Sequence, residues 1–106
     1  MVARVQLPRE AKRGEVIEIR IAIQHAMETG FRYDNFGKPI PKNVINTLVA
    51  RYHGAEIFRA ELGSGVAANP YLQFYTVAEA SGEIEFSWMD DSGAQGSERA
   101  SITVVE

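Results

Sequence analysis

The chain has 106 residues, which suits a single domain spanning residues 1–106. It contains no cysteine, so it offers no disulfide, no thiolate nucleophile and no soft thiolate metal ligand. A formal net charge of −3 argues against nucleic acid as a partner, because a phosphate backbone is met by a basic surface.

The first predicted strands alternate apolar and polar residues. Residues 1–7 read as a short strand and residues 8–14 as a charged turn. Residues 15–25 carry isoleucine at every second position from Ile17 to Ile23, and this pattern predicts a half-buried antiparallel strand. His25 continues the isoleucine parity, so we expect its imidazole to point toward the core at the strand end.

Residues 27–42 form a long stretch without periodicity. It contains the turn-forming residues Gly30, Pro39 and Pro41, several charged residues, and the aromatic residues Phe31, Tyr33 and Phe36. Long loops inside compact domains are uncommon and are often functional, so this one is expected to be an interaction site. The alternative is a surface excursion whose aromatic residues pack back on the domain.

Five further strands are predicted in the remainder of the chain. They span residues 43–53, 55–62, 71–78, 83–89 and 98–105, with glycine-rich or polar turns between them. The strand at 55–62 is charged, as an edge strand would be. Seven short strands at about ten-residue spacing predict an all-β fold, an immunoglobulin-like antiparallel β-sandwich, with Trp88 in its core.

The chemically richest stretch is residues 25–32, where a histidine, a thioether, a carboxylate and a guanidinium fall within eight residues. His25 and Glu28 could form a general base and its orienting group. However, no nucleophile is signalled nearby, and no Gly-x-Ser-x-Gly or phosphate-cradling motif occurs. We therefore expect no catalytic residue and no enzyme activity, and we expect His25 to hydrogen-bond the loop backbone.

A copper site is an alternative reading of the same stretch. His25, Met27, His53 and Met89 are the available ligands, and a small periplasmic β-sandwich could bind copper through such residues. Nothing in the sequence brings His53 to His25. The preferred interpretation therefore includes no metal and no cofactor.

The loop chemistry favours an interface. Gly30 invites a left-handed backbone, so Gly30 and His25 are expected to shape the loop. Arg32 could pair with Glu28 or with a carboxylate of a partner, and arginine and aromatic residues are typical interface anchors. The candidate partner-binding residues are Met27, Glu28, Phe31, Arg32 and Tyr33, with Tyr52, Tyr71 and Tyr75 as further candidate interface aromatics.

Several motifs resemble those of the SoxZ family, and together they cover nearly the whole chain. Residues 25–32 resemble the family motif His-Pro-Met-Glu-Thr-Gly-x-Arg, with Ala26 in the usual proline position. Ile-Pro follows at residues 40–41. Residues 69–74 resemble the Asn-Pro-aromatic strand entry, and residues 88–93 resemble the Trp-x-Asp-x-x-Gly hairpin. Alanine at position 26 frees the backbone and adds an N–H donor.

The resemblance implies a non-catalytic subunit of the SoxYZ sulfur carrier in bacterial thiosulfate oxidation. Its partner would be SoxY, an immunoglobulin-like subunit whose C-terminal Gly-Gly-Cys-Gly-Gly arm carries the sulfur substrate covalently. The chain would pair with and stabilise SoxY in a heterodimer or larger complex and help other Sox enzymes dock transiently. An isolated chain could form a homo-oligomer.

Localisation is expected to be periplasmic. Residues 1–10 show no apolar signal-peptide core, and the resemblance implies export together with a signal-bearing SoxY partner. No apolar run approaches the ~18 residues of a membrane span, so no membrane contact is expected. A free-standing immunoglobulin-like interaction module remains a further alternative.

Overall fold

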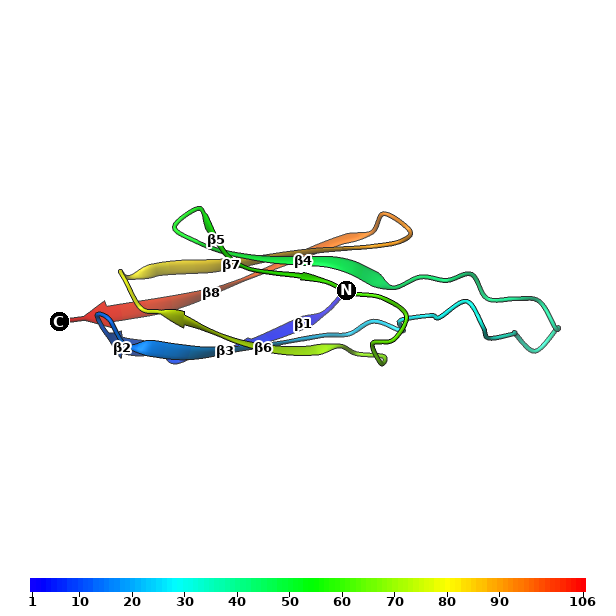
Figure 1. Ribbon diagram of the computed structural model, residues 1–106, viewed down its shortest axis with the longest axis horizontal. Helices are drawn as coiled ribbons and strands as arrows, with labels where there is room; N and C mark the ends of the chain where they lie inside the picture. The colour runs from blue at the N-terminus through cyan, green and yellow to red at the C-terminus, as the bar shows by residue number, and fades with distance from the viewer.

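A computed structural model describes all 106 residues as two facing β-sheets without any helix (Figure 1). The strands are β1 Ala3–Gln6, β2 Glu10–Lys12, β3 Val16–Ile23, β4 Ile45–Tyr52, β5 Ala55–Glu61, β6 Tyr71–Val77, β7 Gly82–Asp90 and β8 Gln95–Val105. The predicted all-β sandwich is confirmed. No helix is long and apolar enough to cross a bilayer.

The strands form a three-stranded sheet in the order β1-β3-β6 and a five-stranded sheet in the order β2-β8-β7-β4-β5. The predicted edge position of β5 is confirmed. Strand β2 was not predicted, since residues 8–14 read as a turn. It has one apolar residue, Ala11, and forms because it pairs with β8, with Ala11 opposite Val104. This pairing is parallel, so the sandwich is not wholly antiparallel.

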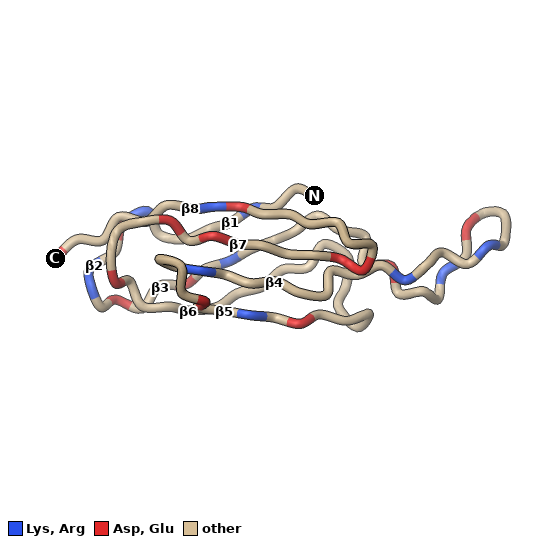
Figure 2. Tube along the Cα trace, turned by 90° about the horizontal axis from the view of Figure 1, so that it is seen from above, with Lys and Arg blue, Asp and Glu red and all other residues tan.

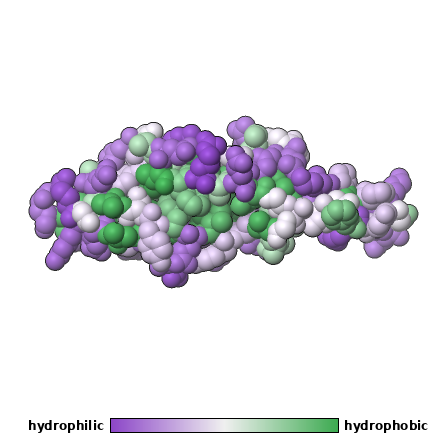
Figure 3. All heavy atoms as spheres, viewed as in Figure 1, coloured by the Kyte–Doolittle hydropathy of each residue, from purple (hydrophilic) through white to green (hydrophobic).

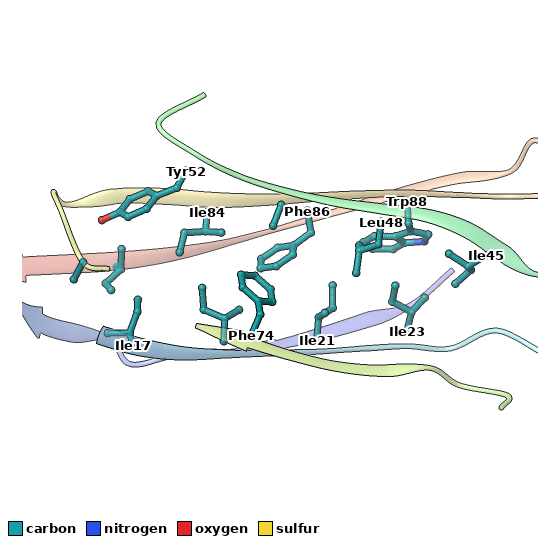
Figure 4. Close-up of a cluster of buried hydrophobic side chains, with 14 of the residues drawn as sticks. Ile17, Ile21, Ile23, Ile45, Leu48, Tyr52, Phe74, Ile84, Phe86 and Trp88 are labelled. Carbon is teal, nitrogen blue, oxygen red and sulfur yellow. The ribbon is translucent and has the colours of Figure 1, made fainter. Parts of the chain in front are cut away.

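The core lies between the sheets and is built from the predicted alternation. The four isoleucines of β3 face Leu48 of β4 and the residues Ile84, Phe86 and Trp88 of β7 (Figure 4). The ring of Phe74 on β6 stacks on Phe58 of β5 with centroids 4.3 Å apart. Trp88 is 3% exposed, which confirms its predicted core position.

Gly96 makes room for the indole of Trp88. The two residues are opposite each other in the β7–β8 ladder. A Cβ built on Gly96 would lie 2.6 Å from Cζ2 of Trp88, far inside van der Waals contact. The glycine in this strand is therefore explained by the close approach of a large side chain on the neighbouring strand.

The molecule is elongated, measuring 60 × 19 × 19 Å along its principal axes. Residues 27–42 extend the long axis as an arm that projects beyond one end of the sandwich (Figures 1 and 2). The C-terminus lies at the opposite end. Strands β5 and β6 run along one long side of the sandwich, while β1 and β8 run along the other (Figure 2).

Candidate functional site

His25 anchors the base of the arm. Strand β3 ends at Ile23, earlier than predicted, yet the His25 side chain is still directed inward and is 7% exposed. Its Nδ1 accepts a hydrogen bond from the Met27 N–H at 2.9 Å, and its Nε2 lies 3.0 Å from Oδ2 of Asp90. Because Nδ1 accepts, the neutral ring carries its proton on Nε2 and donates to Asp90. The expected hydrogen bond to the loop backbone is confirmed.

Asp90 ends β7 and is a buried carboxylate, 5% exposed, at the meeting point of several donors. Besides His25, its oxygens accept hydrogen bonds from Ser92 Oγ at 2.6 Å, from the Ala94 N–H at 3.0 Å and from Asn43 Nδ2 at 3.4 Å. Burial opposes ionisation, but the hydrogen bonds from Ser92, His25, Ala94 and Asn43 outweigh it and lower the pKa of Asp90 to about 2.

The depressed pKa of Asp90 predicts a specific acid sensitivity. An unfolded aspartate titrates near 4, so the ionised carboxylate stabilises the fold above that pH, and this stabilisation is lost as pH falls toward 2. Between about pH 5 and pH 2 the wild-type free energy of unfolding should fall about 2 kcal/mol further than that of Asp90→Asn, which has no carboxyl to titrate. Urea unfolding of both proteins at several pH values measures this, and equal pH dependences would contradict it.

Met27 adopts a left-handed backbone conformation that directs its side chain into the core. Its backbone φ is +51°, in the left-handed region, and its side chain is 3% exposed. The Ile45 N–H donates to Met27 Sδ at 3.3 Å, so the thioether also satisfies a buried backbone donor of β4. The prediction of Met27 as a partner contact is wrong, because its side chain is buried in the domain's own core.

The arm is more regular than the sequence suggested. Glu28 and Asn43 exchange backbone hydrogen bonds at its base, both of 2.9 Å, and the Ile40 N–H donates to the Arg32 carbonyl farther out. At the tip, Oδ1 of Asp34 accepts from the N–H groups of residues 36 and 38 at 2.8 and 2.9 Å. The predicted loop is therefore an arm of two chain segments joined by the isolated antiparallel bridges Glu28–Asn43 and Tyr33–Pro39 and closed by a side-chain-capped turn.

Gly30 and the Glu28–Arg32 pair shape the lower half of the arm. Gly30 has φ +92°, and a Cβ there would lie 3.1 Å from Cβ of Lys42, so the predicted left-handed glycine is confirmed. Glu28 Oε1 pairs with Arg32 Nη1 at 2.7 Å, while Oε2 of Glu28 is buried without a partner. Arg32 itself is exposed, so this pair orients its guanidinium and adds about 0–1 kcal/mol to stability.

The aromatic residues of the arm face solvent. Phe31, Tyr33 and Phe36 are 84%, 67% and 89% exposed. The alternative in which they pack back on the sandwich is therefore wrong. Of the other candidate aromatics, Tyr71 and Tyr75 are exposed on β6. Tyr52 is buried and donates its hydroxyl to the Ala80 carbonyl, so it belongs to the core.

The residues considered for copper are not brought together. Both ring nitrogens of His25 and the sulfur of Met27 take part in hydrogen bonds within the fold. His53 lies on the β4–β5 turn, where its ring packs against Gly82, and Met89 is exposed on β7. No group of three or more His, Cys, Asp or Glu side chains could hold a metal ion.

The functional residue that the sequence reasoning missed is Asp90. From the sequence, Asp90 is recognisable only as part of the Trp-x-Asp-x-x-Gly hairpin motif, because the 65 positions between it and His25 hide their contact. A further signal was present in the alternation: Asp90 continues the inward parity of Ile84, Phe86 and Trp88, and a carboxylate at a core-facing position must be hydrogen-bonded to be stable there.

The family model of the sulphur oxidation protein SoxZ matches residues 5–101, nearly the whole chain. The chain belongs to the SoxZ family. This places the protein in sulfur oxidation, in the family of the non-catalytic carrier subunit that partners SoxY. No curated protein sequence matches the chain.

Solved structures that resemble this SoxZ family member share its fold at low sequence identity. Superoxide reductase (neelaredoxin) from Ignicoccus hospitalis has TM-score 0.74 and 16% identity over 99% of this chain and 81% of its own. A putative superoxide reductase from Thermotoga maritima has TM-score 0.74 and 17% identity over 98% and 86%. The sulfur carrier protein SoxY from Chlorobium limicola f thiosulfatophilum has TM-score 0.64 and 8% identity over 98% and 79%. These likenesses confirm the predicted immunoglobulin-like sandwich and carry no activity to this chain.

Proposed function

We propose that this SoxZ family protein pairs with and stabilises SoxY, whose C-terminal cysteine carries the covalent sulfur intermediates of bacterial thiosulfate oxidation. The observation that carries the proposal is the arm, an ordered projection that presents exposed aromatic residues outside the sandwich. Its base is held by the buried His25–Asp90 hydrogen bond and by Met27. Family membership supplies the identity of the partner.

The contact residues follow from exposure. Phe31, Tyr33 and Phe36 offer large apolar surfaces, and Arg32 is already oriented by Glu28. Backbone hydrogen bonds across the arm fix its shape before binding, so little conformational entropy remains to be lost on docking. Aromatic residues and arginine on such a preorganised element are the groups that dominate binding energy at protein interfaces. Glu28 acts through Arg32 and Gly30 through the arm's shape.

The absence of cysteine supports a scaffold role. A carrier that holds sulfur on a cysteine exchanges readily with other thiols, and a thiol in the neighbouring subunit would compete by forming mixed disulfides. We further propose that the assembled surface helps other Sox enzymes dock transiently and that the complex works in the periplasm after export on the SoxY signal.

The test uses a triple variant, Phe31→Ser with Tyr33→Ser and Phe36→Ser. We expect it to bind a SoxY-type, cysteine-tailed partner at least about tenfold more weakly by isothermal titration calorimetry. Its thermal unfolding should match wild type, because all three side chains are exposed.

The matched control is Val16→Ser, an exposed apolar residue at the start of β3, which should bind as wild type does. If the triple variant binds the SoxY-type partner with unchanged affinity, the arm is not part of the SoxY interface. If wild-type chain and partner elute separately at micromolar concentration, the pairing itself fails.

A further inference from the structure

Strand β6 is an edge strand without any protection against pairing. It reads Tyr-Leu-Gln-Phe-Tyr-Thr-Val and contains no charged residue, no proline and no register shift. On the same side of the sandwich, the edge strand β5 of the other sheet carries Glu56, Arg59 and Glu61, and its pairing with β4 is bulged. Natural sheet proteins block exposed edges with charges, prolines or bulges. Strand β5 is protected in this way and β6 is not.

The free hydrogen-bonding groups of β6 can be assigned from the ladder. Pro70 accepts from the Ile23 N–H, and the Ala78 N–H donates to Glu15, so even-numbered residues face β3. Alternation then directs the N–H and C=O groups of Tyr71, Gln73, Tyr75 and Val77 away from the sheet. These groups make no backbone hydrogen bond within the chain outside the ladder.

The surface beside this edge is apolar. The side of the molecule where β5 and β6 run shows a hydrophobic band between the two sheets (Figure 3). Its partly buried members include Phe58, Leu62 and Leu72. On the outer face, Tyr71 and Tyr75 are 55% and 60% exposed. A strand that pairs with β6 would therefore gain apolar contacts as well as backbone hydrogen bonds.

We propose that this edge joins two copies of the chain through antiparallel β6–β6 pairing, so that two three-stranded sheets become one six-stranded sheet. A two-fold axis through Phe74 sets Tyr71 opposite Val77 and Gln73 opposite Tyr75 of the second copy. In that register all outward N–H and C=O groups of both strands are satisfied. The contact is isologous, as in most closed dimers.

The side chains fit this register. Tyr71 opposite Val77 is an aromatic and β-branched pair, a favourable cross-strand combination. No like charges meet, because β6 has none. The nearest charged groups on the outer face, Glu18 and Arg20 of β3, already pair with each other. Self-complementarity of donors, acceptors and charge is what favours a second copy over an unrelated extended segment.

Two variants test the proposal by different routes. Gln73→Pro removes an outward N–H while sparing the β3 ladder, and proline is tolerated at such edge positions. Tyr75→Lys places a charge on the edge strand, the natural means of blocking edge pairing. The control Val16→Lys adds the same charge to the same outer face on the inner strand β3.

Sedimentation velocity of the purified chain should show a dimer at about 100 µM, with the dissociation constant of the dimer raised at least about tenfold by Gln73→Pro and Tyr75→Lys but not by Val16→Lys. Hydrogen exchange at residues 71, 73, 75 and 77 should slow as concentration rises. A monomer at that concentration, or a dimer insensitive to both edge variants, overturns the proposal. Protection of these amides only when a SoxY-type partner is added also overturns it, since the edge would then belong to that partner.

Discussion

Asp90→Ala should lower the free energy of unfolding by about 3 kcal/mol, because it leaves the buried His25 ring N–H and several part-buried donors without an acceptor. These donors are the His25 ring N–H and the N–H groups of Ser92 and Ala94. A buried donor that loses its partner also loses the hydration it had in the unfolded chain, so the cost exceeds that of one surface hydrogen bond. Urea unfolding at neutral pH measures the change.

Two companion variants sharpen this result. Asp91→Ala removes the neighbouring, more exposed carboxylate, which accepts from the Val44 N–H and the Asn46 side chain, and it should cost less than Asp90→Ala, about 1–2 kcal/mol. Asp90→Asn keeps the size of the side chain, but its amide has one acceptor oxygen where the carboxylate has two. Its NH2 group must therefore face either the His25 ring N–H and Asn43 or the N–H groups of Ser92 and Ala94. The asparagine variant should therefore be destabilised relative to wild type at neutral pH, and equal stability of the two proteins would show that the second acceptor oxygen of Asp90 contributes nothing.

Met27→Ala should lower the free energy of unfolding by about 3 kcal/mol, an effect as large as that of Asp90→Ala. Truncation removes a buried side chain from the core and deprives the Ile45 N–H of its sulfur acceptor. Because Met27 closes the base of the arm, amide exchange between residues 28 and 43 should also become faster. Thermal unfolding and hydrogen exchange report the two effects separately.

Met27→Leu and Met89→Ala serve as controls. Leucine preserves most of the volume but removes the acceptor, so it should cost about 1 kcal/mol. Met89 is 38% exposed on the outer face of β7, and truncating it should cost less than about 1 kcal/mol. A Met27→Ala effect no larger than that of Met89→Ala would contradict the anchoring role.

Local pattern was sufficient to predict most strands and the core. The period-two isoleucines of β3 and the inward row ending at Trp88 are set by burial on one face, so alternation alone reveals them. Gly30 was recognisable for a similar reason, since a left-handed turn favours glycine wherever it occurs.

Features that depend on distant partners could not be predicted. Strand β2 has almost no pattern of its own and exists through pairing with β8. The inward turn of Met27 depends on its positive φ and on a donor 18 positions away. Asp90 accepts local hydrogen bonds from Ser92 and Ala94, but its contacts with His25 and Asn43 form only in the tertiary fold. Each requires the tertiary fold, which a pass along the chain does not provide.

The elongated shape has a consequence for spectroscopy in solution. The chain is roughly three times as long as it is wide, so its rotational diffusion is strongly anisotropic. Amide N–H vectors in the β-ladders lie across the long axis, so fast rotation about that axis reorients them. N–H vectors parallel to the long axis are reoriented only by the slower end-over-end tumbling. If nitrogen-15 relaxation rates are interpreted with a single correlation time, the rates of the N–H vectors parallel to the long axis would be wrongly assigned to chemical exchange. When an axially symmetric rotational diffusion tensor is used, the amides of a rigid arm should show the same R2/R1 ratios as the amides of the β-ladders.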